Sequence, residues 1–282
     1  MTVGDFMTEQ DFQVVRKFLV ERSAIVLEPG KEYLVETRLA PLLRQQNLNS
    51  IGELIAQLRS QPGSGLYRLI VEAMVTTESS FFRDHQPFED LRKAVIPDLI
   101  ERRRDERRLH IWCAASSTGQ EPYSLALLIR EHFPQLTGWR ISLLASDLSQ
   151  QVLQRARAGR YRQIEVNRGL PAALLVKYFE QHGTDWQLQS AIRSMVDFQE
   201  INLAQAWPAL PRMDLVLIRN VMIYFDVETK KATLGRVARV LRPDGYLLLG
   251  GAETTFNLDD SYRRVLALKS GFYQLTDAVP TK

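Results

Sequence analysis

The sequence has one cysteine, Cys113, among 282 residues. A single cysteine excludes an intramolecular disulfide and any metal site built from several thiolates, and it favours a reducing compartment. We interpret Cys113 as a small buried filler. The four histidines, His85, His110, His132 and His182, lack the spacing of metal ligands, and no G-x-S-x-G segment is present. We therefore expect neither a metal nor a serine triad.

Long hydrophobic runs are also missing. The longest stretch without a charged residue is 109–120, which is shorter than the ~18 apolar residues that suggest a membrane span. The N-terminal sequence MTVGDFMTEQDF has neither the basic start nor the apolar segment of a secretory signal. The expectation is a cytoplasmic protein that inserts no segment into a membrane.

Excess charge is small, with a net charge of +3 and a pI near 9.0. Most of it comes from residues 101–108, which hold five arginines and three acidic residues. A mixed-sign run is typical of a solvated helix end with salt bridges, and the alternative is a phosphate-binding patch. No basic stripe with interleaved aromatic residues is present, which argues against a nucleic-acid partner.

The first 75 residues are expected to be helical. Residues 8–11, Thr-Glu-Gln-Asp, match a capping box, and Phe12, Val15 and Leu19 follow at helical spacing. A second apolar stripe covers 51–58 and ends before Pro-Gly-Ser-Gly at 62–65. We assign residues 1–85 to an N-terminal helical domain with its linker, and residues 86–282 to a second domain.

From residue 109 short apolar runs alternate with helical segments. The expected strands are 109–113, 141–145, 195–198, 214–218 and 246–250, with helices at 123–133 and 150–158. This alternation predicts a mostly parallel, doubly wound α/β sheet. Residues 264–268 and 272–275 are expected to add an antiparallel hairpin. Between 161 and 197 the alternation lapses, which indicates either a small inserted subdomain or a mobile loop.

In such a sheet, ligands bind beyond the carboxyl ends of the strands. Residues 114–121 follow the first strand, and their small side chains with Gly119 suit a close approach to a ligand, although a tight strand-to-helix connection is the alternative. Asp147 follows the second strand and is either a ribose-binding acid or a helix N-cap. Arg219 and Asn220 follow the fourth strand, where polar side chains are hard to bury without a partner.

Four segments, in order, resemble motifs of the CheR family, the S-adenosylmethionine-dependent methyltransferases that esterify glutamates on bacterial chemoreceptors. Residues 75–84 (VTTESSFFRD) are similar to the signature T-T-N-x-T-x-F-F-R-[DE], and 114–124 (AASSTGQEPYS) to A-x-S-T-G-E-E-P-Y-S. Residues 144–149 (LASDLS) and 219–226 (RNVMIYFD) resemble two further motifs. The resemblance covers nearly the whole chain. It implies a Rossmann-like class I methyltransferase sheet with an N-terminal all-helical domain and a small inserted β-subdomain.

The resemblance also implies S-adenosylmethionine as the cofactor. Thr77, Ser79 and Arg83 would approach its methionine part and sulfonium, and Asp147 would take the ribose. The other implied contacts are Glu121, Asn202, Leu203, Arg219 and Asn220, with Asn202 on the adenine side. Three positions depart from the family: Thr77 replaces a usual Asn, Ser79 replaces a Thr, and Gln120 replaces the first Glu of E-E. We therefore place the acidic role on Glu121.

Arg83 and Tyr224 are the implied catalytic residues. A glutamate side chain is a carboxylate at neutral pH, so it can attack a sulfonium methyl without a general base. The enzyme then contributes positioning and partial removal of the carboxylate's water. We expect Arg83 to hold or screen the acceptor carboxylate and Tyr224 to orient it. The alternative is that Arg83 pairs with Asp84 or another neighbour and that Tyr224 belongs to the core.

Family members meet the cytoplasmic helical bundle of the receptor partly through a basic helix. The matching segment 31–44 is only thinly basic, and we expect Arg38 and Arg44 to bind the substrate, with Pro41 kinking or restarting the helix. Some members also bind a receptor pentapeptide as an added strand. The turn at 182–190 is short, so we favour a member without this tether. We expect a monomer that is recruited to receptor arrays at the membrane.

Two other functions stay open. One is a methyltransferase that acts on a small-molecule carboxylate, against which the dedicated helical domain argues. The other is a non-catalytic signalling protein that binds the cofactor for its shape alone. Such a scaffold would not require Arg83, Asp147 and Tyr224 together.

Overall fold

The computed structural model describes residues 7–61 and 65–276, and it divides into two compact units. The first unit ends at Thr76 and also includes Tyr224–Thr229, and the second comprises Thr77–Ile223 and the chain from Lys230 onward. Within the described residues, no helix has the length and apolar character needed to cross a membrane.

The division between the units lies ahead of the boundary that we expected at residues 85 and 86. Residues in this interval hydrogen-bond to the second unit. Ser117 Oγ donates to the Thr77 carbonyl oxygen (2.8 Å), and the Phe82 N–H donates to Ser124 Oγ (2.9 Å). The segment that resembles the family signature is therefore attached to the sheet domain.

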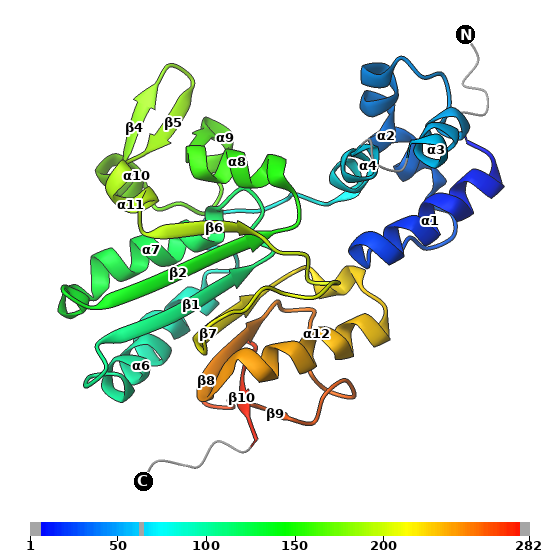
Figure 1. The fold of residues 1–282 in the computed structure, drawn as a ribbon. Coiled ribbons are helices and arrows are strands. Elements are labelled where there is room, and N and C mark those ends of the chain that lie inside the picture. Colours follow the sequence, from blue (N-terminus) through cyan, green and yellow to red (C-terminus); the bar gives the residue numbers. More distant parts are fainter. Residues whose placement is uncertain (1–6, 62–64, 277–282) are drawn as a thin grey trace. The chain divides into compact units, whose positions relative to one another are not determined.

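The described residues before Thr76 in the first unit form α1 (Glu9–Ser23), α2 (Glu32–Gln46), α3 (Ile51–Ser60) and α4 (Leu66–Met74), drawn in blue to cyan in Figure 1. The predicted capping box begins α1: Thr8 Oγ1 accepts from the Asp11 N–H (3.1 Å), and Asp11 Oδ2 accepts from the Thr8 N–H (3.0 Å). These bonds satisfy donors that a helix start leaves unpaired. α2 does not restart at Pro41, because it is one continuous helix there.

Seven strands form the central sheet of the second unit, in the order β6-β2-β1-β7-β8-β10-β9 (Figure 1). The first five are parallel to one another, and β10 is antiparallel to both of its neighbours, β8 and β9. Their bounds are β1 (Arg108–Ala114), β2 (Arg140–Asp147), β6 (Val196–Glu200), β7 (Met213–Ile218), β8 (Leu241–Leu249), β9 (Tyr262–Arg264) and β10 (Phe272–Leu275). The predicted α/β sheet is confirmed.

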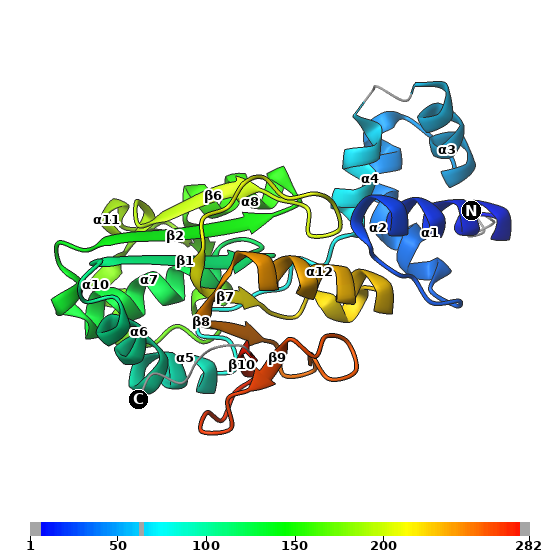
Figure 2. The same cartoon turned by 60° about the horizontal axis from the view of Figure 1, so that its bottom comes forward.

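Helices connect these strands. Figure 2 shows α5, α6 and α7 together on one side of the sheet. The helical elements are α5 (Gln86–Asp90), the π-helix η1 (Leu91–Val95), α6 (Ile96–Arg102), α7 (Gln120–His132), η2 (Pro134–Leu136), α8 (Gln150–Ala158), α9 (Gln163–Val166), α10 (Ala172–Tyr178), α11 (Ser190–Arg193), η3 (Met222–Tyr224) and α12 (Val227–Val240).

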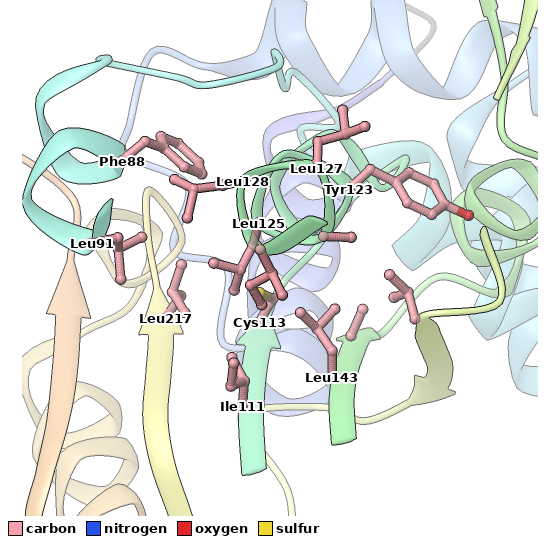
Figure 3. Packing of buried hydrophobic residues seen from close by; sticks show 14 of the residues in the cluster. Phe88, Leu91, Ile111, Cys113, Tyr123, Leu125, Leu127, Leu128, Leu143 and Leu217 are labelled. Carbon is pink, nitrogen blue, oxygen red and sulfur yellow. The ribbon is translucent and has the colours of Figure 1, made fainter. Parts of the chain in front are cut away.

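Both faces of the sheet are buried. Residues 111–114 of β1 and all of β7 are shielded from solvent. Since neighbouring side chains of a strand point to opposite faces, each face must be covered. Figure 3 shows one of these interfaces, in which Leu125 of α7 lies near Cys113 of β1 and Leu128 of α7 lies near Phe88. Cys113 is fully buried, as predicted.

The segment between β2 and β6 carries its own small sheet rather than a mobile loop. β3 (Arg160–Arg162), β5 (Asp185–Leu188) and β4 (Phe179–His182) pair antiparallel in the order β3-β5-β4. Figure 1 shows the β4–β5 hairpin beside α10 and α11. Gly169 lies against the backbone of the segment that resembles the family signature. A Cβ at this residue would lie 2.0 Å from the Phe81 carbonyl oxygen, so only glycine permits this close approach.

The C-terminal hairpin is displaced from its predicted position. Its first strand is Tyr262–Arg264, not 264–268. The Val265 N–H still donates to the Phe272 carbonyl (2.8 Å), but the chain then turns, with the Leu268 N–H bonded to the Val265 carbonyl (3.1 Å). Leu266 is 88% exposed, so the apolar run that suggested a strand there is not a buried one.

The charged run 101–108 is only partly the solvated helix end that we predicted. Arg104 is exposed and pairs with Glu101 (2.6 Å). Arg103, by contrast, is buried, and its guanidinium lies 2.6 Å from both Asp214 Oδ1 and Asp244 Oδ1. A buried arginine requires such partners, since an unpaired charge in the interior is costly. Part of the run is therefore an internal ion-pair network at the amino ends of the strands.

Candidate active site

The strand order reverses between β1 and β7: β2 and β6 lie on one side of this point, and β8 lies on the other. The loops that leave the carboxyl ends of β1, β2, β6 and β7 share one edge of the sheet, where open α/β sheets bind ligands. Asp147 is the last residue of β2, and the loops or the helix starts behind them hold Glu121, Asn202 and Arg219. The structure thus brings these four predicted residues to one edge.

The loop after β1 has an uncommon backbone conformation. Ala115, Ser117 and Gly119 have φ values of 53°, 49° and 93°. A Cβ at Gly119 would lie only 3.0 Å from Ala156 Cβ, so a larger residue would be crowded as well as strained. Positive φ at residues other than glycine is costly and concentrates at functional sites. This backbone conformation is consistent with the ligand-binding loop expected after β1.

Asp147 ends β2 and is buried. Its Oδ2 accepts from the Ser117 N–H (2.9 Å), and its Oδ1 accepts from the Ser149 N–H (3.1 Å). The N-cap of α8 is Ser149, whose hydroxyl accepts from the Val152 N–H. The interpretation of Asp147 as the helix cap is therefore wrong. Two backbone donors fix the Asp147 carboxylate between the loops after β1 and β2.

Asn202 and Leu203 lie in the turn after β6. The Ile201 N–H donates to the Asp147 carbonyl (3.1 Å), which places this turn beside the end of β2. Asn202 Oδ1 accepts from the Ala204 N–H (2.9 Å), and the Leu203 carbonyl accepts from Arg236 Nη2 (2.7 Å). Arg236, on α12, was not among the predicted residues.

Arg219 joins two acidic side chains. Its Nη1 lies 2.6 Å from Glu121 Oε2, and its Nη2 lies 2.7 Å from Asp84 Oδ2. The Arg219 side chain is only 2% exposed, so the two carboxylates compensate a charge that water does not reach. Nη2 also donates to the Arg83 carbonyl (3.2 Å). Arg219 therefore ties the signature segment to the start of α7.

Arg83 does not pair with Asp84, because Arg219 takes that carboxylate. The residue Arg83 is half-buried, and its Nη1 donates to the Glu78 carbonyl at 3.4 Å. Ser79 is half-buried and Thr77 is exposed, in the same segment. Arg168 pairs with the Glu78 side chain, and this hydrogen bond and charge lower the pKa of Glu78. The charge of Arg83 makes a further, smaller contribution to the lowered pKa of Glu78, whose hydrogen-bonded ion pair is with Arg168.

Asn220 follows Arg219 with a positive φ of 59°. Its Oδ1 is buried and has no hydrogen-bond partner among the described residues. The backbone N–H of Asn220 donates to the carboxylate of Glu253 (2.9 Å). Glu253 was not among the predicted residues, since nothing in the segment Gly-Gly-Ala-Glu indicates where its carboxylate points.

The other predicted residues belong to the first unit. Tyr224 is half-buried, and its carbonyl accepts from the Val26 N–H (2.9 Å). Arg38 donates to the Met74 carbonyl at the end of α4 and to Thr76 Oγ1, whereas Arg44 is exposed. Arg38 therefore closes the C-terminus of α4 within its own unit.

The residues at the sheet edge fit S-adenosylmethionine. This molecule presents ribose hydroxyls and an ammonium group, which are hydrogen-bond donors, and the edge offers the carboxylates of Asp147 and Glu121. An unpaired buried polar atom such as Asn220 Oδ1 costs about 1–3 kcal/mol, and a ligand donor would remove that cost. Burial raises the pKa of the Cys113 thiol well above its usual range, so Cys113 does not supply a thiolate. Across residues 7–61 and 65–276, no three His, Cys, Asp or Glu side chains are grouped to hold a metal ion.

Comparison with known proteins identifies both parts of the chain. Residues 10–75 match the family model described as "CheR methyltransferase, all-alpha domain", and residues 77–269 match "CheR methyltransferase, SAM binding domain". "Chemotaxis protein methyltransferase 1" of Pseudomonas aeruginosa is 42% identical over 260 residues, which cover 90% of this chain and 94% of that protein. "Chemotaxis protein methyltransferase Cher2" of Pseudomonas putida is 40% identical over 269 residues, covering 94% and 97%.

These matches confirm the predicted family, the cofactor and the class of fold. The α/β sheet is that of a class I methyltransferase, and it follows an all-helical N-terminal domain. The cofactor is S-adenosylmethionine. The chain is an S-adenosylmethionine-dependent methyltransferase, and it belongs to the CheR methyltransferase family.

Proposed function

We propose that the protein transfers the methyl group of S-adenosylmethionine to glutamate carboxylates on the cytoplasmic domains of chemoreceptors. The products would be glutamate methyl esters and S-adenosylhomocysteine, and the reaction would serve sensory adaptation. The names of the relatives support a role in chemotaxis. The observation that carries the proposed substrate is the state of Arg83. Its neighbour Asp84 is bonded to Arg219 and the nearby Glu78 to Arg168, so no ion pair among the described residues includes Arg83, whose charge acts on Glu78 only as a lesser contribution to its lowered pKa.

Arg83 would bind the acceptor carboxylate and hold it in line with the methyl group. When bound, the cofactor supplies a methyl group activated by its sulfonium. The acceptor is already ionised near neutral pH, because the ordinary pKa of glutamate is about 4.3, so no base has to remove a proton. Positioning of two reactants is itself a large source of rate. Tyr224 is proposed, on the family resemblance, to orient the acceptor through its hydroxyl.

The remaining binding roles are also proposals. Asp147 would accept hydrogen bonds from the ribose hydroxyls, because two backbone N–H groups hold its carboxylate in place. Glu121 and Asn220 would bind the methionine part, together with Thr77 and Ser79. Further contacts would come from Asn202 and Leu203 at the adenine and from Arg219, which holds Glu121.

The substrate would dock through the helical unit. Arg44 and Lys31 are exposed at the two ends of α2, and positive side chains suit an acidic receptor bundle. Arg38 contributes less than we expected, because it is bonded to the end of α4. We further propose a cytoplasmic monomer that is recruited to receptor arrays and does not need a receptor pentapeptide.

The test is incubation with labelled S-adenosylmethionine and receptor-containing membranes, followed by mild alkali. Methyl esters are base-labile, so the label should be released as methanol. Label that survives alkali would indicate N- or C-methylation and would overturn the proposal. A receptor whose methylated glutamates are replaced by alanine is the matched control. Labelling of small carboxylic acids without membranes would favour a small-molecule methyltransferase instead.

A further inference from the structure

Glu253 has an unusual set of partners. It lies in the loop after β8 and is 9% exposed, and its carboxylate accepts four backbone N–H groups. Oε1 accepts from Val221 (3.0 Å) and Met222 (2.8 Å), and Oε2 accepts from Asn220 (2.9 Å) and Gly250 (2.8 Å). Hydrogen bonds to an ionised group are stronger than those between neutral groups. One side chain thus joins the loop after β7 to the loop after β8.

The four donors determine the conformation of the turn that contains Asn220. Three consecutive N–H groups, of residues 220–222, converge on one carboxylate, which requires the chain to bend sharply there. Asn220 has the positive φ that such a bend needs, and this conformation is costly for a residue with a side chain. Gly250 permits the close approach of the second loop. A Cβ at Gly250 would lie 2.7 Å from Glu253 Oε2 and 2.9 Å from the Asn220 nitrogen.

The bend carries the side-chain amide oxygen of Asn220, which has no hydrogen-bond partner within the described residues. Asn220 Oδ1 is buried and accepts no hydrogen bond there, although buried acceptors are nearly always satisfied. An acceptor kept unpaired at the ligand-binding edge of the sheet is suited to a donor on a ligand. Without the Glu253 carboxylate, the turn would lose the bonds that hold Asn220 at positive φ.

We propose that Glu253 is a positioning residue of the cofactor site, acting through Asn220. It fixes the turn so that Asn220 Oδ1 meets a donor of S-adenosylmethionine or S-adenosylhomocysteine. The inference rests on the proposed assignment of Asn220 to this site and not on the identity of the methyl acceptor. Glu253 itself touches neither the cofactor nor the substrate in this proposal.

The test is a double-mutant cycle with S-adenosylhomocysteine binding measured by calorimetry on the full chain. Glu253→Gln keeps the size of the side chain but replaces one accepting oxygen with a donor. We expect Glu253→Gln and Asn220→Ala each to weaken binding about 10- to 100-fold. If Glu253 acts through Asn220, the affinity of the double variant for S-adenosylhomocysteine should be no lower than that of whichever single variant binds less tightly. Losses that multiply would overturn the proposal, and so would wild-type affinity in either single variant.

Two further measurements separate positioning from a loss of folding. Asp260→Asn removes the same charge from an exposed site in the same loop, and it should bind like wild type. Circular dichroism checks the fold, and if Glu253→Gln does not fold, Gly250→Ala perturbs the same junction and should also weaken binding. With the receptor substrate saturating and the cofactor varied, Glu253→Gln should raise KM for S-adenosylmethionine more than it lowers kcat. Because the binding assay needs no acceptor, a failure to methylate receptors would contradict the proposed function without changing this result.

Discussion

Arg219 Nη1 lies 2.6 Å from Glu121 Oε2, and the arginine side chain is 2% exposed while the glutamate is 13% exposed. This contact joins the end of β7 to the first turn of α7, two places that are 98 residues apart in the chain. It places a paired charge at the edge of the sheet where the cofactor is proposed to bind. The strength of this pair, and the roles of its neighbours, can be measured.

Replacing Arg219 with methionine should destabilise the protein. Removal of one partner of a buried ion pair leaves a charge without compensation and costs about 3–5 kcal/mol. Urea denaturation measures the free energy of unfolding. Arg239→Met, at an exposed position on α12, is the control and should be close to neutral. Adding Glu121→Gln to Arg219→Met should restore part of the loss, and a purely additive double variant would contradict the pairing.

Asp147→Asn should reduce affinity for S-adenosylhomocysteine about 10- to 100-fold, because one of the two accepting oxygens is replaced by an NH2 group, which can only donate. Calorimetry gives the affinity. Ser149→Ala is the matched control, since it removes the N-cap of α8, at a cost of about 1 kcal/mol in stability, and leaves Asp147 in place. Equal affinities in the two variants would show that Asp147 is not a cofactor ligand.

Arg83→Ala should lower kcat about 100-fold, as expected when a reactant is no longer held in place, and the fold should persist. Methyl transfer to receptor membranes gives kcat, and circular dichroism reports the fold. The control is Arg168→Ala, which removes an exposed arginine that pairs with Glu78 in the same segment. Turnover near that of wild type in folded Arg83→Ala protein would refute the role of Arg83.

Arg44→Glu should raise KM for receptor membranes several-fold with little change in kcat, because rim charges at an interface act mainly on encounter. Raising the salt concentration should reduce the difference from wild type. Arg59→Glu makes the same charge change at an exposed position on α3 and should not alter KM. If Arg44→Glu leaves KM unchanged, α2 is not part of the substrate interface.

His110 should make stability depend on pH. Burial lowers its pKa below the ordinary value of 6.5, and the charges of Arg108 and Arg242 add to this, while Asp214 and Glu106 oppose it. As the pH falls, His110 therefore takes up its proton at a higher pH in the unfolded chain than in the folded protein. Stability is unaffected above about pH 6.5 and is lost as pH falls below it.

The check is the free energy of unfolding at about pH 7.5 and about pH 5.5. Wild type should lose more stability between these two values than His110→Gln, because the variant has no imidazole to protonate. His132→Gln, at an exposed histidine, should behave like wild type. The same pH dependence in His110→Gln and wild type would contradict the assignment.

Much of the sheet followed from local patterns. The runs that predicted strands were apolar on both faces, and β1 and β7 are indeed covered on both sides. The capping box at Thr8 and the helix Gln150–Ala158 also follow from neighbouring residues. Short-range chemistry decides such features, so the sequence is sufficient to predict them. The strand predicted at 264–268 failed for the contrary reason, because burial of an apolar run depends on what lies opposite it in the fold.

The sequence by itself determined the family, the parallel sheet and the loops in which Asp147 and Arg219 stand. Only the tertiary structure decided which charges meet: Arg219 with Glu121 and Asp84, and Arg103 with Asp214 across 111 residues. It also decided that the Glu253 carboxylate accepts hydrogen bonds from the backbone N–H groups of the turn at residues 220–222. The physical reason is that a buried charge must find a partner wherever the chain brings one, and distance along the sequence does not limit that choice.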